Sequence, residues 1–172
     1  MTPLIYNAEE TGLYYRATPD NSLCYSYEQL NGSKNALERI TVLLYVNMSW
    51  SDKLKPLVIG KSKMPRCFKG INLDTLPVMY FTNSSAWMTS VLFQQWVMDW
   101  DVALIRDNRN LVTIDNCPAH PQIKSLRNIR LEFLPANTTS LIQPLDQGIV
   151  KNLKIFYGKE LIQMIISVLM KM

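Results

Sequence analysis

The first half of the chain consists of short apolar runs with a strand-like pattern, separated by polar segments. These runs are rich in the β-branched and aromatic residues typical of strands. They cover residues 3–7, 12–18, 39–48, 55–60 and 77–82. Glu9 and Glu10 follow the first run, so we expect them to end the first strand. The polar residues 19–35 predict a loop or a hairpin with a wide connection.

The period of the pattern changes in residues 89–104, which are predicted to be a helix. Phe93, Trp96, Val97 and Trp100 stand at positions i, i+3, i+4 and i+7, which places them on one helix face. Thr89 or Ser90 is suitable as its N-cap. We interpret the aromatic stripe as core packing and not as a surface on which nucleic-acid bases stack.

Strands and helices alternate in the rest of the chain. The pattern predicts a strand at 110–116, a short helix at 120–126, a strand at 129–135 and a loop at 136–148. A long helix follows, with an almost continuous apolar face formed by Ile149 or Val150, Leu153, Tyr157, Leu161, Ile165 and Leu169. This order predicts an α/β fold with a mixed sheet flanked by helices. Ligand sites in such sheets lie at the carboxyl ends of strands, where Asp115 is expected.

Composition adds a weak indication of an anionic partner. The 172 residues are 48% hydrophobic and suit a single domain, and the net charge of +4 favours nucleic acid only mildly. One stretch, which we call the basic stretch, holds six cations and no acid: Lys53, Lys55, Lys61, Lys63, Arg66 and Lys69. It is either a solvated loop or an edge that contacts phosphates.

The three cysteines, Cys24, Cys67 and Cys117, form no disulfide framework and indicate a reducing compartment. Together with His120 they could provide four zinc ligands. The spacing argues against such a site because no CxxC pair is present. No signal peptide is visible, and the apolar run at 161–170 is too short to span a bilayer, so we expect a soluble intracellular protein.

Glu9, Asp115 and Asp146 lie on separate predicted elements and together could hold a hard cation such as Mg²⁺ or Mn²⁺. Two such ions can activate water and stabilise the leaving oxygen in phosphoryl transfer. Each acid also has a structural alternative: Asp146 as a helix N-terminal acid, Asp115 in an Asx turn, and Glu9 on the surface. Spacing alone favours these alternatives.

The local sequence changes this balance. The segments "NAEETGLYYRATP", "RITVLLYVNM", "KLKPLVIGKSKMPRCFK", "AWMTS", "TIDNCPAHP" and "LPANTTSLIQPLDQGIVKNLK" occur in this order. Together they closely resemble the catalytic domain of the Tigger and pogo-like transposases. This DDE superfamily also includes jerky-like proteins and centromere protein B. The resemblance runs from about Ile5 to about Tyr157.

The resemblance implies a ribonuclease-H-like fold in which three acids bind two Mg²⁺ or Mn²⁺ ions for DNA strand cleavage and joining. Asp115 matches the second acid and Asp146 the third. Glu9 replaces the aspartate of the family's "NADETG", and its extra methylene moves the carboxylate outward. A shift of about 1 Å can cost on the order of a hundredfold in rate. Asn116 and His120 are expected to brace the turn after Asp115, with a supporting role beside the metal ligands.

The resemblance further implies a nuclear protein that binds DNA chiefly through its phosphates, with no membrane association; a homo-oligomer stays open. Full-length members resemble a paired helix-turn-helix region followed by this domain. We therefore expect residues 1–172 to be a single catalytic domain, a fragment without that region. A domain that has lost activity, binds no metal and serves as a DNA-associated or protein-interaction module is the alternative. A thiol enzyme using Cys117 and His120 is a weaker one.

Overall fold

A computed structural model describes residues 4–15, 38–49, 51–52, 54–104 and 110–170. Six strands form one sheet: β1 (Ile5–Tyr14), β2 (Arg39–Asn47), β3 (Leu57–Gly60), β4 (Met79–Thr82), β5 (Asn110–Ile114) and β6 (Ile129–Phe133). The helices are α1 (Ser90–Ala103), α2 (Thr139–Ile142) and α3 (Val150–Leu169), with short helical turns η1 (Arg66–Phe68), η2 (Leu73–Thr75) and η3 (Leu145–Ile149). Lys53, Cys24 and the predicted 19–35 connection lie outside the described residues.

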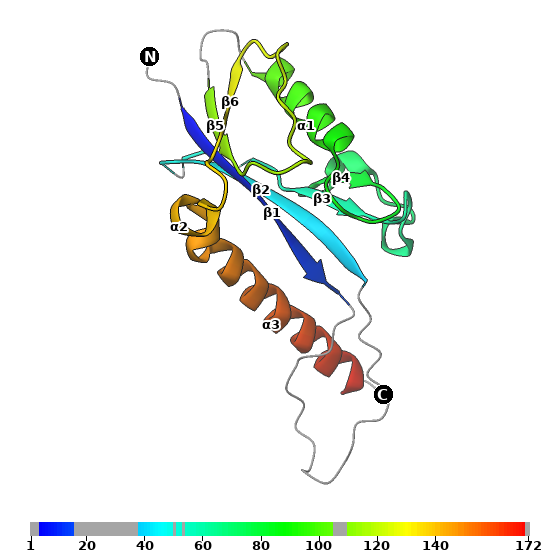
Figure 1. Ribbon diagram of the computed structural model, residues 1–172. Coiled ribbons are helices and arrows are strands. Elements are labelled where there is room, and N and C mark those ends of the chain that lie inside the picture. Colours follow the sequence, from blue (N-terminus) through cyan, green and yellow to red (C-terminus); the bar gives the residue numbers. More distant parts are fainter. Residues whose placement is uncertain (1–3, 16–37, 50, 53, 105–109, 171–172) are drawn as a thin grey trace.

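The sheet is mixed, with strand order β4-β3-β2-β1-β5-β6 (Figure 1). β2 is antiparallel to both β1 and β3, whereas the β1–β5, β5–β6 and β3–β4 pairs are parallel. The expectation of a mixed sheet flanked by helices is confirmed, and the arrangement is consistent with a ribonuclease-H-like α/β fold. The carboxyl end of β5 lies beside the middle of β1, which brings Asp115 close to that strand.

β1 is one continuous strand, so the prediction that Glu9 and Glu10 end a first strand is wrong. Glu9 pairs with Leu44 and Glu10 with Leu43 in a ladder that continues to Tyr14. The backbone hydrogen bonds to β2 keep the acidic pair in extended conformation despite the low strand propensity of glutamate. Successive strand residues point to opposite faces, so the two carboxylates leave β1 on opposite sides.

α1 covers the sheet face that carries Tyr6 and Ala8. Thr89 caps the helix, its Oγ1 accepting from the Leu92 N–H at 3.3 Å, and Trp96 packs edge-on against Tyr45 with ring centroids 4.9 Å apart. The predicted aromatic stripe is therefore core packing, as expected. The buried side chains of this face include Tyr6, Ala8, Leu43, Tyr45, Phe93, Trp96, Val97 and Val112.

Two predictions for the second half are wrong. Residues 120–126 form turns and no helix, because proline at 121 disfavours helical backbone at the preceding residue and lacks the N–H. Ile123 and Leu126 still pack against the core from this irregular segment. The predicted loop at 136–148 contains α2 and most of η3.

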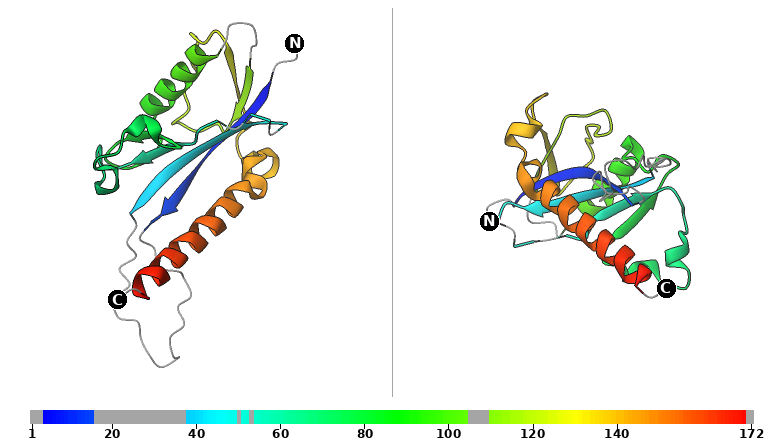
Figure 2. Two further views of the ribbon diagram at one scale, coloured as in Figure 1. Left: turned by 180° about the vertical axis from the view of Figure 1, so that it is seen from behind. Right: turned by 90° about the horizontal axis from the view of Figure 1, so that it is seen from below.

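α3 lies on the opposite side of β1 and β2 from α1 and runs beside β1 (Figures 1 and 2). Its predicted apolar face is covered only in part: Val150 is buried, Leu153, Tyr157 and Leu161 are half-buried, and Ile165 and Leu169 are exposed. None of the helices within the described residues combines the length and hydropathy required to cross a membrane. Glu9 of β1 contacts Gln143, which lies between α2 and η3.

Candidate metal centre

The segment before α3 is fixed to β1 by buried hydrogen bonds. Gln143 is fully buried, and its Nε2 donates to the Ala8 carbonyl at 2.9 Å and to the Glu9 carboxylate. The Leu145 N–H donates to Asn7 Oδ1 at 3.1 Å, and Asn7 Nδ2 donates to the Thr113 carbonyl of β5 at 3.2 Å. These bonds hold Glu9, β5 and the η3 turn in one fixed arrangement.

Asp146 lies in η3, within the range 136–148 that is predicted to be a loop, and not in the first turn of the long helix. Its N–H donates to the Gln143 carbonyl at 3.1 Å, and its residue is exposed. Gly148 separates it from α3 and has a φ of +129°, a backbone conformation that residues other than glycine rarely adopt. The kink at Gln147 and Gly148 therefore sets the position of Asp146 relative to the helix.

His120 links Glu10 to Asp115 on the other face of β1. Its Nε2 lies 2.8 Å from Glu10 Oε1 and its Nδ1 lies 2.6 Å from Asp115 Oδ1. The imidazole is fully buried, with its centroid 4.5 Å from the Phe93 ring. Burial by itself lowers the His120 pKa, but the contacts with Asp115 and Glu10 outweigh burial and raise it to about 10. At neutral pH the ring is an imidazolium held between two carboxylates.

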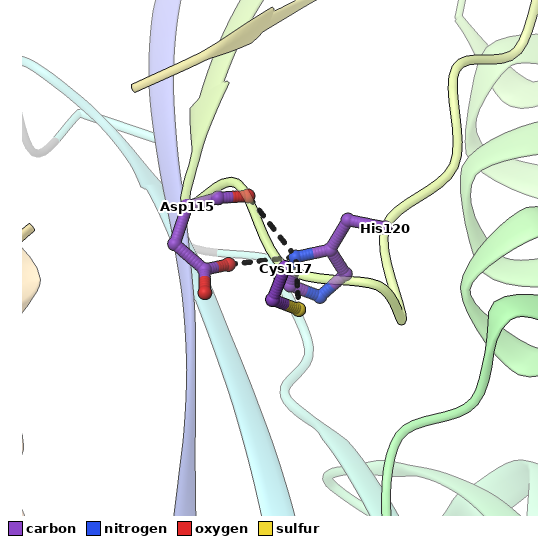
Figure 3. Close-up of side chains that lie close together, drawn as sticks. All are labelled: Asp115, Cys117 and His120. Carbon is purple, nitrogen blue, oxygen red and sulfur yellow. Dashed lines mark hydrogen bonds and ion pairs between the residues drawn. The ribbon is translucent and has the colours of Figure 1, made fainter. Parts of the chain in front are cut away.

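The turn after β5 brings a thiol to the same ring (Figure 3). The His120 N–H donates to the Cys117 carbonyl at 3.0 Å, which closes a turn centred on Pro118 and Ala119. Cys117 Sγ lies 3.3 Å from His120 Nδ1. Burial, followed by the nearby carboxylates, raises the pKa of Cys117 to about 11, so the thiol stays protonated at neutral pH. This state does not suit the nucleophile of a thiol enzyme.

Among the described residues, no Lys, Arg or His forms an ion pair with Glu9. Burial raises the pKa of Glu9 to about 8, and the carboxylates of Asp146, Glu10 and Asp115 contribute further, with a partial offset from His120. The His120 imidazolium contacts Glu10 and Asp115 directly and reaches Glu9 only through its field. A bound divalent cation would stabilise the ionised form of Glu9 and lower its pKa.

Asp115 has a single close cationic partner in the described residues. Its Oδ1 is buried and lies 2.6 Å from His120 Nδ1, and no other donor among the described residues reaches this oxygen. Asn116, the next residue, is exposed.

The basic stretch is not brought to the acids. Lys55, Lys61, Lys63, Arg66 and Lys69 are exposed along β3, η1 and the sheet edge near β4, and β2 separates β3 from β1. Cations nearer to the acids were missed. Lys151 and Lys154 of α3 line a hollow of about 430 Å³ together with Asp146.

Comparison with known proteins places the chain in a family. The DDE superfamily endonuclease profile matches residues 37–170. Mouse Tigger transposable element-derived protein 4 is 42% identical over 164 residues, covering 95% of this chain and 32% of its own. The human Jerky protein homolog is 38% identical over 157 residues, covering 84% and 28%, and human major centromere autoantigen B is 29% identical over 162 residues, covering 92% and 25%. The chain belongs to the DDE superfamily of endonucleases.

The match has two limits. This DDE domain spans about a third or less of the length of these relatives, and no solved structure matches it. The matched range contains Asp115 and Asp146 but begins after Glu9.

Sequence reasoning about this DDE domain missed three polar residues. Asn7 and Glu10 flank the predicted acid within "NAEETG", and Gln143 precedes the third acid in "LIQPLDQG". Two signals in the sequence could have indicated these residues. Asn7 is a polar residue inside an apolar strand pattern, and all three residues belong to the motifs that contain the predicted acids. Alternation along a strand predicts that Glu9 and Glu10 point to opposite sides. What the sequence could not give was the partners that each side chain meets there.

Proposed function

We propose that this domain is a transposase-derived DDE nuclease domain that acts in metal-dependent cleavage and joining of DNA strands in the nucleus. The observation that carries the proposal is Glu9, a half-buried carboxylate without a cation partner among the described residues, whose pKa is raised by burial and by the nearby carboxylates of Asp146, Glu10 and Asp115. A structural acid would be paired with a cation or exposed to water. The arrangement is unfavourable for a metal-free protein and suits a cation-binding one.

The donor set fits a hard divalent cation. Glu9, Asp115 and Asp146 offer carboxylate oxygens, and the His120 ring is the one cationic group that contacts Asp115 Oδ1 in the described residues. Oxygen ligands favour Mg²⁺ or Mn²⁺ over softer metals. Two bound ions would supply Lewis acidity that activates a water, and later a DNA 3′-hydroxyl, and that neutralises charge at the scissile phosphate.

The surrounding residues orient this donor set. His120 fixes Asp115 through its Nδ1 and anchors itself to Glu10 through its Nε2. On the other face of β1, the Gln143 amide donates a hydrogen bond to the Glu9 carboxylate. Supporting bonds of this kind keep ligands in a productive geometry, and their loss typically lowers metal affinity by about 10- to 100-fold.

DNA contacts are proposed at two places. Lys151 and Lys154 adjoin Asp146, where the phosphate to be cleaved would lie, and we assign them the contact closest to the chemistry. The basic stretch would contact phosphates farther along the duplex. Because both contacts are electrostatic, binding should tolerate different sequences and weaken steeply with salt.

The glutamate at position 9 supports a second candidate. Its side chain is one methylene longer than the aspartate of the resembling motif, and Gln143 already occupies one of its oxygens. A domain that has lost cleavage and serves as a DNA-associated or protein-interaction module is therefore the alternative. The name of one relative, centromere autoantigen B, denotes a chromosomal location and not a reaction.

The deciding experiment is a nicking assay on supercoiled DNA with Mg²⁺ or Mn²⁺, using the domain fused to a DNA-binding module. We expect Asp115→Asn and Asp146→Asn to abolish nicking and Glu9→Asp to raise it. Asp74→Asn, an exposed acid in η2, is the matched control and should leave the rate unchanged. Nicking that survives Asp115→Asn contradicts the proposal. A Glu9→Asp variant that binds metal but stays inert favours the inactive-domain alternative.

A further inference from the structure

The turn after β5 gathers three different metal-binding groups at one point. One ligand atom each from Asp115, Cys117 and His120 lies within 4.8 Å of the others (Figure 3). Asp115 and Cys117 are half-buried and His120 is buried. This set differs from the three carboxylates of the proposed hard-cation site, with which it shares only Asp115. A thiol and an imidazole are poor ligands for Mg²⁺ and preferred ligands for Zn²⁺.

The distances are close to those of a tetrahedral zinc site. Zinc bonds of about 2.0 Å to nitrogen and 2.3 Å to sulfur put the two ligand atoms roughly 3.5 Å apart at a tetrahedral angle. Cys117 Sγ and His120 Nδ1 are 3.3 Å apart. The 2.6 Å contact between His120 Nδ1 and Asp115 Oδ1 is shorter than two zinc bonds allow, so the carboxylate must move outward by a fraction of an ångström.

The far side of the imidazole already has the partner that a metal-binding histidine uses. His120 Nε2 lies 2.8 Å from Glu10 Oε1, which leaves Nδ1 directed at the thiol and at Asp115. Histidines bound to zinc almost always donate their second N–H to a carboxylate or carbonyl, which fixes the ring and increases its basicity. The buried Asp115 Oδ1 has no close donor in the described residues other than this same imidazole, at 2.6 Å.

We propose that Asp115, Cys117 and His120 form a site for a thiophilic divalent cation, represented by Zn²⁺, with Glu10 as the residue that positions the imidazole. Binding releases one proton from His120 Nδ1 and one from Cys117 Sγ, while the Nε2 proton stays on its bond to Glu10. Three protein ligands leave a fourth coordination position for water. The third protein ligand of this site is Asp115 and not a second cysteine.

The site also provides a means of control. Because Asp115 belongs to both donor sets, a zinc ion here and a magnesium ion between Glu9, Asp115 and Asp146 exclude or weaken each other. Zinc would hold the domain in a state without nuclease activity. This consequence rests on the proposed function, whereas the zinc site itself does not.

Cobalt titration of the metal-free 172-residue chain tests the site without an activity assay. Co²⁺ bound to a thiolate gives a charge-transfer band in the near ultraviolet, and we expect that band to saturate at one equivalent. Zn²⁺ should then abolish it stoichiometrically because it binds such sites more tightly. Wild-type protein that shows no band with excess cobalt overturns the proposal.

Variants locate the thiolate. Cys117→Ser, a near-isosteric change in a half-buried turn, should remove the band, while Cys67→Ser in the exposed η1 turn and Cys24→Ser should keep it. Glu10→Gln should lower zinc affinity by about 10-fold or more while keeping the band. A band that persists in Cys117→Ser, or disappears in Cys67→Ser or Cys24→Ser, contradicts the assignment. Circular dichroism and thermal unfolding establish that each variant is folded.

Discussion

Glu9 and Glu10 are neighbours in the same strand and of the same residue type, yet the structure gives them opposite surroundings. Glu10 points to the α1 face, where its Oε1 meets the buried His120 imidazolium at 2.8 Å. Glu9 points to the α3 face, where it meets the neutral amide of Gln143 and the field of other carboxylates. One carboxylate is neutralised within the protein and the other is not.

The surroundings of the two glutamates, and not their residue type, indicate that Glu10 has a structural role and Glu9 a functional one. The Glu10–His120–Asp115 chain is a satisfied ionic network that joins β1 to the turn after β5. Glu9 has a raised pKa, which indicates an unfavourable charge that the folded protein tolerates. Sites of this kind are often maintained because a ligand compensates for them. We therefore expect opposite changes in folding stability when a charge is removed from the Glu10–His120–Asp115 network and when it is removed from Glu9.

The largest effect on folding stability is expected in the Glu10–His120–Asp115 network. His120→Gln removes the only cation from the pair of carboxylates and should destabilise the domain by about 2–3 kcal/mol. This is below the 3–5 kcal/mol typical of fully buried pairs, because the Glu10 and Asp115 side chains remain 17% and 28% exposed. Chemical denaturation in the presence of a chelator measures the difference.

The pH dependence of that loss is also fixed in sign. The folded-state pKa of His120 is raised to about 10 from an ordinary 6.5, so its contribution is fully present below pH 6.5 and is lost as the pH rises through 10. Wild type and His120→Gln should therefore converge in stability at alkaline pH. A constant difference from pH 6 to pH 10 would show that the loss comes from packing against Phe93 and not from charge.

A smaller effect of opposite sign is expected at Glu9. Glu9→Gln should stabilise the metal-free domain by about 1–2 kcal/mol, in the range usual for relief of strain at functional sites. Its amide oxygen can still accept from Gln143, so the hydrogen bond is kept while the charge is removed. Glu10→Gln is the matched control and should destabilise the domain.

The folded-state pKa of Glu9, about 8, lies above its ordinary 4.5, so the proton is bound more tightly in the folded state. The loss of folding stability caused by ionisation of Glu9 is absent below pH 4.5, grows as the pH rises, and is complete above pH 8. The stability gap between Glu9→Gln and wild type should follow the same course. A Glu9→Gln variant that is less stable than wild type at pH 8 would mean that Glu9 is a structural acid like Glu10.

Secondary structure could be predicted where one pattern dominated. The strand at 39–48 and the helix at 89–104 were found because apolar spacing there agrees with the packing, as Trp96 and Tyr45 show. Glu9 and Glu10 were misplaced because pairing with β2 overrides their local preference. The Asp146 turn was missed because the kink depends on the backbone angle of Gly148.

The candidate site was predictable in membership but not in geometry. Motif resemblance singled out Asp115, Asp146, Glu9 and His120. The contact between Cys117 and the His120 ring depends on a turn closed by one backbone hydrogen bond, which spacing alone does not reveal. The difference in charge compensation between the two faces of β1 can be recognised only from the three-dimensional fold.

The smallest expected effects concern DNA affinity on the Glu9 side of the sheet. Lys151→Ala with Lys154→Ala should reduce the slope of log affinity against log salt by about 1–2, because each phosphate contact contributes about 0.9. Lys61→Ala, Lys63→Ala and Arg66→Ala together should reduce the slope without changing the cleavage rate on saturating DNA. If that triple variant leaves the salt slope untouched, the basic stretch is not a contact surface. Fluorescence anisotropy at several salt concentrations gives the slopes.

The most direct test of the central claim is Mn²⁺ binding, followed by electron paramagnetic resonance of free Mn²⁺, in wild type, Glu9→Gln and Glu10→Gln. The account predicts tight binding by wild type and a loss in Glu9→Gln that exceeds the 10- to 100-fold typical of supporting residues. Glu10→Gln should lower Mn²⁺ affinity by no more than about 10- to 100-fold, since its carboxylate is directed to His120 and acts on the metal ligands only through it. Equal Mn²⁺ affinity in Glu9→Gln and wild type would contradict the account, because the uncompensated carboxylate would then hold no metal.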